Sequence, residues 1–484
     1  MSHRGALALV LHTHIPYVEG FGTWPFGEEW LWEAVATVYL PLLNLLEQAE
    51  APVTLGLTPV LCDQLETLPG DAGVRLAAFL GETRRAVHEV DRRALAQAGE
   101  HELAAELRRA GGDYERALED LGAREGRLLE AFARLGTHGP VELWTSAATH
   151  AVLPMLATGA GTGLQIATGI AAHERRFGGL AGGFWLPECA YEPGLERELA
   201  DRGVLAFCVD QTTVHGAGAP EALEPVITPA GAVAVPIDWP TVELVWSATT
   251  GYPAAMGYRD YHHRTVHDLR PWSNAGNPYR PQEAHALARR HARDFVHRCI
   301  ERLERHALER NRPGLLCCAL DTELLGHWWY EGQVWLGQVF EAARSLGLEL
   351  VTVADGLERV PLVERELAPS TWGTGKDLRT WDSPRVAELA FAARAAELRT
   401  VAAAAAYSDA SLMRAVRELL AMQAGDWAFQ VTRELAGSYP LERVAAHAAA
   451  HDAALGALTD SGHVPDPALR NLAPYLELAP LLAP

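Results

Sequence analysis

The sequence predicts an α/β barrel with added helices, and three observations indicate this fold class. Short apolar runs recur along the chain and are separated by segments of helical character. Most of these runs are apolar throughout, as in parallel strands that helices cover on both faces. Polar motifs follow several runs directly, and a barrel presents its reactive groups at the carboxyl ends of its strands.

The predicted strands follow one another along most of the chain. They cover residues 6–11 (ALALVL), 141–145 (VELWT), 182–186 (GGFWL), 204–209 (VLAFCV), 233–237 (VAVPI), 242–246 (VELVW), 315–320 (LLCCAL) and 348–353 (LELVTV). Residues 82–137 are rich in Ala, Arg, Glu and Leu, which predicts amphipathic helices inserted in a barrel domain over 1–375. Residues 376–484 have helical runs without a strand signal and predict a C-terminal helical domain. The turn-rich, aromatic segment 262–281 is expected to wall the site.

Composition and net charge limit the classes of molecule that this protein is expected to bind. The 484 residues are 49% hydrophobic and carry a net charge of −21, which disfavours nucleic acid and anionic membranes and suits a neutral sugar polymer. The six cysteines lie mostly inside apolar runs and form no C-x-x-C pair, so reduced thiols in a cytoplasmic protein are expected. The protein is also expected to be a monomer. Walker, Rossmann, G-x-S-x-G and H-E-x-x-H motifs are absent from the sequence, so no cofactor is predicted.

The first candidate motif is His12-Thr13-His14, directly after the first strand. Two imidazoles at alternate positions of an extended segment point the same way. They could bind a metal such as zinc or donate hydrogen bonds to hydroxyl groups. One structural histidine beside an incidental surface one is the alternative interpretation.

The second candidate is Glu188 in FWLPECAY, which follows a strand and has Trp185 and Tyr191 nearby. Aromatic neighbours shield a carboxylate from water and stack against sugar rings. The alternative is a solvent-exposed glutamate at the barrel rim.

The third candidate is LDTELLGHWWYEG, where Asp321 and Glu323 follow the most hydrophobic strand. A buried strand that ends in a carboxylate can present an acid to a substrate, although both residues could instead cap a helix. Glycosidic chemistry needs two carboxyl groups, one as nucleophile or base and one as proton donor. The motifs that carry Glu188 and Asp321 therefore predict this chemistry.

Aromatic residues near turns add a possible sugar groove. The chain has 14 tryptophans, and several lie near Gly and Pro in predicted loops, although some must belong to the core. The candidates are Trp24, Trp246, Trp372, Trp381 and the Asp426-Trp427 pair.

These motifs resemble glycoside hydrolase family 57 and, within it, the α-1,4-glucan branching enzymes. The matching segments run in order along nearly the whole chain. They are LVLHTHIPYV, WPFGEEWLWEA, LTPVLCDQLE, ELWTSAATHAVLP, GGFWLPECAY, VWSATTGYP, LDTELLGHWWYEG, TWGTGKDLRTW and AGDWAF. The resemblance implies a distorted (β/α)7 TIM-like barrel with an inserted helical region and a C-terminal helical domain.

The resemblance also implies roles for individual residues. Glu188 matches the family nucleophile and Asp321 the general acid/base of a retaining mechanism without metal or cofactor. The residues implied to line the α-glucan site are His12, His14, His150, Trp24, Trp246, Trp372, Trp381, Asp426 and Trp427.

One segment departs from the branching pattern. Branching members that resemble this chain carry a longer loop with a tyrosine that covers the site and disfavours water. Here the stretch between Asp210 and Trp246 is short and has no tyrosine. Because water competes for a covalent intermediate, branching is the leading hypothesis and α-glucan hydrolysis the alternative.

Overall fold

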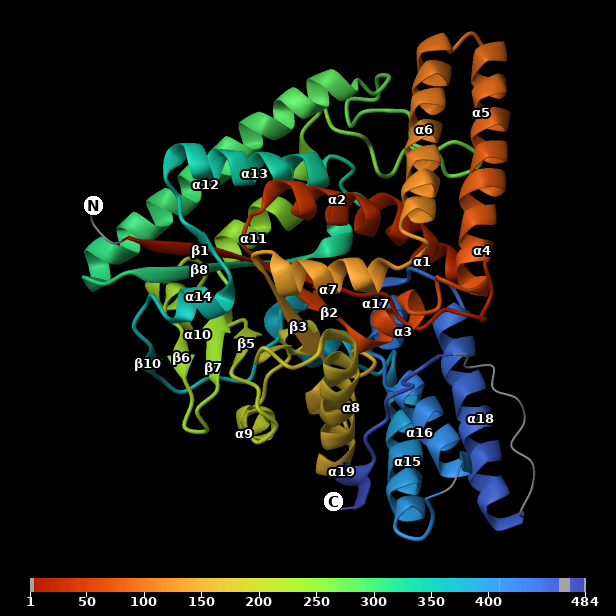
Figure 1. Cartoon of the computed structure of the whole chain (residues 1–484), viewed down its shortest axis with the longest axis vertical. Helices are drawn as coiled ribbons and strands as arrows, with labels where there is room; N and C mark the ends of the chain where they lie inside the picture. The colour runs from red at the N-terminus through yellow and green to blue at the C-terminus, as the bar shows by residue number, and fades with distance from the viewer. Residues whose placement is uncertain (1–3, 409, 461–470, 483–484) are drawn as a thin grey trace.

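The centre of the computed structural model, which describes residues 4–408, 410–460 and 471–482, is a curled parallel sheet (Figure 1). The barrel strands are β1 Gly5–Thr13, β2 Val53–Leu57, β3 Val141–Ser146, β4 Gly183–Trp185, β5 Ala206–Val209, β7 Val233–Pro236 and β8 Gly314–Asp321. They pair in parallel in the order β8-β1-β2-β3-β4-β5-β7. A parallel bridge between Ile237 and Cys317 closes the ring. The predicted distorted (β/α)7 barrel is confirmed.

Three short strands extend the sheet. β6 Val226–Ile227 pairs antiparallel with β7, β10 Val363–Glu364 pairs with β6, and β9 Leu350–Val351 pairs with β1. The strand predicted over 348–353 therefore exists only as β9, and Val353 already begins helix α14 Val353–Leu357.

Helices cover the outside of the barrel. These are α1 Glu28–Ala34, α2 Leu40–Ala49, α3 Pro59–Leu65, α8 Gly159–Phe177, α9 Leu195–Ala200, α10 Thr212–His215, α11 Trp239–Trp246, α12 Pro281–Arg310, α13 Gly332–Leu346 and α14. Leu7, Leu9 and Leu11 of β1 face this helical layer, whereas Ala6 and Ala8 face the smaller core inside the barrel. Burial on both faces explains why β1 is apolar almost throughout.

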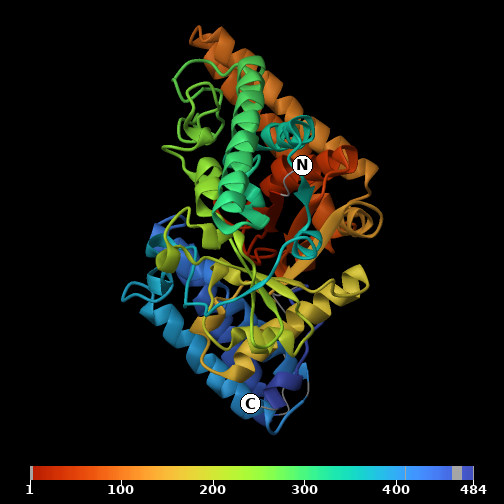
Figure 2. The same ribbon diagram turned by 90° about the vertical axis from the view of Figure 1, so that its left-hand side faces the viewer.

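Two further helical groups lie outside this layer. After β2 come α4 Asp71–Ala78, α5 Arg85–Gln97, α6 His101–Ala123 and α7 Leu128–His138, and α5 and α6 form the long hairpin of Figure 1. The chain ends with α15 Ala387–Ala404, α16 Ala410–Met422, α17 Gly425–Arg433, α18 Tyr439–Asp460 and α19 Ala479–Leu482. Figure 2 shows these last helices at the end away from the hairpin. The division into domains at residue 375 stays a prediction.

One further strand prediction is wrong, and one barrel strand was not predicted. Residues 242–246 were expected to form a strand but belong to α11, which has Pro240 in its first turn. Val242 and Val245 are buried at helical spacing, so the apolar run VELVW reflects one helix face. β2 was not predicted, because VTLGL contains a glycine and is only five residues long.

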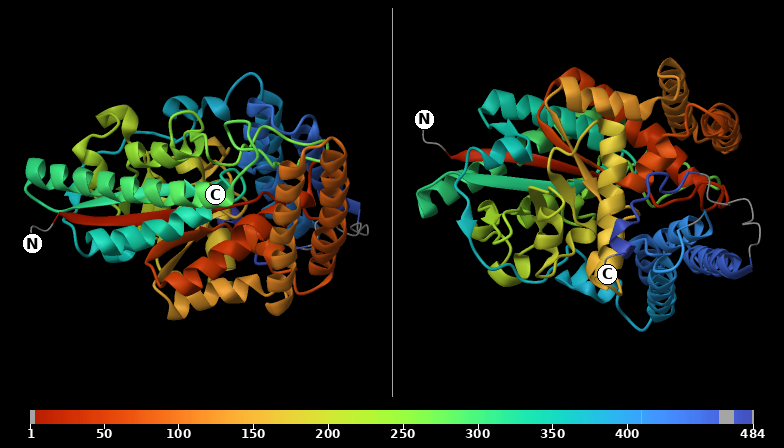
Figure 3. Two further views of the ribbon diagram at one scale, coloured as in Figure 1. Left: turned by 90° about the horizontal axis from the view of Figure 1, so that it is seen from above. Right: turned by 60° about the horizontal axis from the view of Figure 1, so that its bottom comes forward.

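Buried polar contacts attach the C-terminal helices to the barrel. The Glu397 carboxylate of α15 accepts hydrogen bonds from Ala157 N (3.0 Å), Thr158 Oγ1 (2.6 Å) and Gln423 Nε2 (3.0 Å). Gly161 leaves room for it, since a Cβ there would lie 2.2 Å from Glu397 Oε1. α19 packs against α8, as Figure 3 shows. Among the helices of the described ranges, none has the length and apolar character that a membrane span requires.

Replacing Glu397 tests this attachment. Glu397→Ala leaves three donors without this acceptor, of which the Gln423 amide is buried, so we expect the free energy of unfolding to fall by about 3 kcal/mol. The change is measured by urea denaturation, with the exposed Glu388→Ala on the same helix as the control, expected within about 0.5 kcal/mol of wild type. Equal midpoints for the two variants would contradict the proposed attachment.

Candidate active site

Polar side chains gather where the barrel strands end. β1 ends at His12 and Thr13, His150 follows β3, Glu188 follows β4, and Asp321 is the last residue of β8. The register pairs His12 with Asp321 across neighbouring strands. The carboxyl edge of the sheet therefore brings together residues from four segments of the sequence.

Glu188 lies in a strained turn that a tryptophan holds in place. The Glu188 backbone has φ 61° and ψ 20°, a left-handed conformation that is uncommon outside glycine and is concentrated at functional sites. Trp372 donates twice to this residue, from its backbone N to Glu188 O and from Nε1 to Glu188 Oε2, both at 2.9 Å. His150 Nδ1 lies 3.9 Å from Glu188 Oε1. The hydrogen bond from Trp372 Nε1 thus orients the carboxylate.

Both carboxyl groups have raised pKa values, and Glu188 influences the ionisation of Asp321. Burial raises the pKa of Glu188 to about 7, and the Asp426 carboxylate adds to the rise, whereas the Trp372 hydrogen bond and His14 oppose it. Burial also raises the pKa of Asp321 well above its usual value, and the negative charge of Glu188 raises it further. An ionised Glu188 beside a protonated Asp321 is the state that this arrangement favours.

Asp321 occupies the N-cap position of a short 3-10 turn, Thr322–Leu324. Within the part of the chain that the structure describes, its side chain makes no capping hydrogen bond. The Glu323 carboxylate instead accepts from Tyr39 Oη (2.7 Å) and from the His14 backbone N (3.1 Å). Glu323 thereby fixes the segment after β1, and the carboxyl group of Asp321 stays available to a ligand.

A carboxylate from the C-terminal helices reaches this edge. His14 Nε2 lies 3.0 Å from both oxygens of Asp426 in α17, and His14 Nδ1 lies 3.0 Å from Thr58 Oγ1. Burial lowers the pKa of His14, but the carboxylates of Asp426, Glu323 and Glu188 together outweigh it, so this pKa is raised. Burial raises the pKa of Asp426, but the charge and hydrogen bond of His14, together with His150 and a backbone hydrogen bond, outweigh it, so this pKa is lowered. The two residues form a charged, largely buried pair.

The other two histidines are neutral. His12 Nε2 lies 3.0 Å from His150 Nε2, and the His150 ring stacks on that of His14 with centroids 4.0 Å apart. Burial lowers the pKa values of His12 and His150 well below normal, and neighbouring imidazoles lower them further. The His12 ring also stacks on Trp185 at 4.7 Å. These rings form a rigid polar wall beside Glu188.

Three of these residues have the donor types of a metal site. His14, His150 and Asp426 offer ligand atoms within 4.8 Å of one another. Two imidazoles and a carboxylate suit a divalent transition metal. Both ring nitrogens of His14 are already hydrogen-bonded, so an ion there would have to replace the contact with Asp426.

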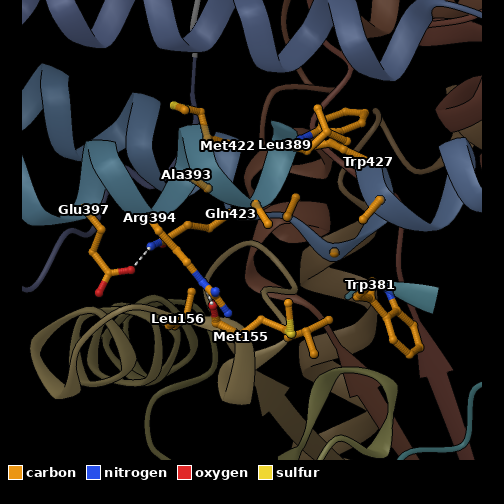
Figure 4. A pocket seen from close by; sticks show the side chains of 15 residues that line it. Met155, Leu156, Trp381, Leu389, Ala393, Arg394, Glu397, Met422, Gln423 and Trp427 are labelled. Atoms are coloured by element: carbon orange, nitrogen blue, oxygen red, sulfur yellow. Dashed lines mark hydrogen bonds between the residues drawn. The ribbon is translucent and has the colours of Figure 1, made fainter. Parts of the chain in front are cut away.

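The predicted aromatic residues occupy different environments. Trp372 contacts Glu188 and Trp185, with the two indole centroids 5.0 Å apart. Trp24 and Trp246 are 73% and 41% exposed. Trp381 and Trp427 are buried and line a small, mostly apolar hollow of about 60 Å³ between the barrel and the C-terminal helices (Figure 4). Glu188 and Asp321 do not line this hollow.

Sequence reasoning missed a buried ion pair beside the site. Lys376 Nζ lies 2.6 Å from Asp210 Oδ2, and both side chains are largely buried. The same ammonium group lies over the ring of Trp239. Asp210 directly follows β5, just as Asp321 is the last residue of β8. Its position at a strand end could therefore have identified it as a candidate site residue. Lys376 belongs to the TWGTGKDLRTW segment that carries Trp372. The pair fixes the loop whose tryptophan donates to Glu188.

Comparisons with known proteins agree with this geometry. The family model described as glycosyl hydrolase family 57 matches residues 8–366, and the model described as 1,4-alpha-glucan branching enzyme, C-terminal, matches residues 390–477. A probable 1,4-alpha-glucan branching enzyme of Mycobacterium tuberculosis is 34% identical over 94% of this chain and 92% of its own length.

Two crystal structures are similar over nearly the full chain. A family 57 branching enzyme from the archaeon Pyrococcus horikoshii has a TM-score of 0.91 and 29% identity, covering 99% of this chain and 97% of its own. The α-amylase AmyC of Thermotoga maritima has a TM-score of 0.80 and 25% identity, covering 95% and 94%.

Substitutions in the loop that carries Trp372 should change the pKa of Glu188. Trp372→Phe removes a donor that stabilises the ionised carboxylate, so we expect the pKa of Glu188 to rise. Lys376→Met should raise it too, since the loop loses its attachment, and Lys376→Arg should restore part of the effect. The measurement is a pH titration of δ-¹³C-labelled glutamate, with the Glu188 signal assigned by its loss in Glu188→Gln.

Arg379→Gln is the control for these variants, since Arg379 is exposed and pairs with Asp377 of the same loop. A Glu188 titration unchanged in Lys376→Met would show that the ion pair does not position Trp372.

Proposed function

This chain belongs to glycosyl hydrolase family 57, and we propose that it acts as a 1,4-alpha-glucan branching enzyme. One observation carries the choice of branching within the family. The region that matches the branching-enzyme C-terminal model contains Asp426, and the Asp426 carboxylate is hydrogen-bonded to His14 at the site. The C-terminal helices thus supply part of the chemistry.

In the first step of the proposed reaction, Glu188 attacks the anomeric carbon of an α-1,4-linked glucan. Asp321 gives its proton to the departing glycosidic oxygen, and a covalent β-glucosyl enzyme forms. The pKa shifts support this assignment, because burial and the Glu188 charge raise the pKa of Asp321 well above its usual value, and Glu188 accepts a stabilising hydrogen bond from Trp372.

In the second step, a 6-hydroxyl group of a glucan attacks the same carbon and the bond to Glu188 breaks. The hydroxyl proton passes to the Asp321 carboxylate, which restores the starting state. Retention of the α configuration follows from the two displacements. His12, His14 and His150 are proposed to bind the donor chain, and the aromatic residues implied by the family resemblance are proposed to line the glucan groove.

The proposal includes a cytoplasmic role on glycogen or a related glucan. All six cysteines are free and buried, which suits a reducing compartment. The chain is expected to act as a monomer without metal or cofactor.

Hydrolysis is the second candidate, and one observation favours it. Ion pairs hold the segment after β5 against the barrel. Arg310 pairs with Glu221, and Arg312 and Arg365 both pair with Glu224. A segment held in this way is poorly suited to act as a mobile cover that excludes water.

Product analysis on amylose distinguishes the two functions. We expect new α-1,6 linkages, counted by ¹H NMR and isoamylase debranching, to outnumber new reducing ends. Reducing ends that rise without new branches would identify a hydrolase.

Removing either reacting carboxyl group should abolish turnover. We expect Glu188→Gln and Asp321→Asn each to lower the rate about a thousandfold or more, because one loses the nucleophile and the other the proton donor. Unfolding temperatures near that of wild type would establish that both variants fold. Glu192→Gln removes an exposed carboxylate four residues after Glu188 and should keep normal turnover. Normal turnover in either site variant would refute the assignment.

A further inference from the structure

Three aromatic side chains from separate segments meet at the surface, and we call them the outer aromatic face. Trp246 and Trp328 are 41% and 43% exposed, and their ring centroids lie 6.2 Å apart. Tyr261 lies beside Trp328 at 6.4 Å and is partly exposed. Large exposed aromatics gathered in one place usually mark a binding surface.

Cation–π contacts and a hydrogen bond hold the outer aromatic face in place. The guanidinium groups of Arg270 and Arg264 lie 4.0 Å and 4.9 Å from the Tyr261 ring centroid. Arg270 also donates to His327 O at 3.3 Å, which joins the Tyr261 loop to the turn that carries Trp328. Rigid aromatic rings lose little conformational entropy when a ligand stacks on them.

The face lies at the end of β8 that carries Asp321. Trp328 follows Asp321 by seven residues, beyond the carboxyl end of the strand. α11 begins beside the middle of β8, where Asp238 N donates to Cys317 O at 2.8 Å. Its last residue, Trp246, reaches Trp328. α11 therefore runs along β8 toward the catalytic edge, so the face lies at the same end of the barrel as the site.

We propose that the outer aromatic face binds the acceptor α-glucan, the second chain whose 6-hydroxyl group receives the transferred segment. This inference rests on the proposed function, since a hydrolase needs no second chain. Flat aromatic rings stack on the apolar faces of glucose units, and a neutral polymer is not repelled by the net charge of −21.

Binding the acceptor here determines what happens to the glucosyl enzyme. The bound chain raises the local concentration of 6-hydroxyl groups relative to water. The acceptor oxygen then forms the new bond to the anomeric carbon, the bond to Glu188 breaks, and Asp321 takes the hydroxyl proton. The face therefore favours transfer over hydrolysis without taking part in the first step.

The test measures transfer and cleavage separately on amylose. Trp328→Ala and Tyr261→Ala should lower the ratio of new α-1,6 linkages to new reducing ends about tenfold, because they remove contacts with the acceptor alone. Total cleavage, counted as the sum of both products, should stay within about twofold of wild type. Trp328→Phe keeps an aromatic ring and should retain most of the branching.

Phe391→Ala is the matched control, because Phe391 is a 76% exposed aromatic residue on α15, outside the face. Unfolding temperatures establish that each variant folds. A ratio unchanged in Trp328→Ala, or branching and cleavage that fall in parallel, would overturn the acceptor site. A wild-type enzyme that makes no α-1,6 linkages would instead overturn the proposed function itself.

Discussion

Glu188 and Asp321 compete for one proton, because both are largely buried and the charge of Glu188 opposes ionisation of Asp321. The hydrogen bonds around the two groups determine which carboxyl group keeps that proton. Trp372 donates to Glu188 and stabilises its ionised form, whereas Asp321 accepts no capping hydrogen bond among the described residues. This asymmetry makes one carboxyl group a nucleophile and the other an acid. The strained backbone at Glu188 is tolerated because Trp372 binds its carbonyl oxygen as well as its side chain.

The C-terminal helices take part in this control and do not merely cover the barrel. Asp426 keeps His14 charged, and both groups act on the ionisation of Glu188, in opposite directions. A displacement of α17 would therefore change the charge balance at the nucleophile. The docking of Glu397 on the barrel limits such movement, so a contact remote from the reacting atoms helps to maintain their electrostatics. Stability and catalysis are coupled here through helix position.

The barrel could be predicted from the sequence where strands are buried on both faces, as β1 and β8 are, because their apolar runs are continuous. The same criterion wrongly predicted a strand for VELVW, which belongs to helix α11. A short apolar run can form either a buried strand or the buried face of a helix, so its hydrophobicity alone does not distinguish them. Glu188 and Asp321 could be found because each follows a strand directly. The contact between His14 and Asp426 joins residues 412 positions apart, and the attachment of Lys376 to Asp210 joins loops. No local pattern encodes such pairs, so only the folded chain reveals them.

The balance between transfer and hydrolysis depends on how the enzyme favours a sugar hydroxyl over water. One solution is a mobile cover, but the segment after β5 is held down by arginines from α12, from the turn that follows it and from the β10 side of the barrel. The other solution is to concentrate the acceptor, and this requires a rigid surface more than a moving one. Arg264 and Arg270 already hold Tyr261 in place beside Trp328. A chain without a tyrosine in its short loop can thus still direct its intermediate toward a glucan, because the outer aromatic face is proposed to hold the acceptor chain.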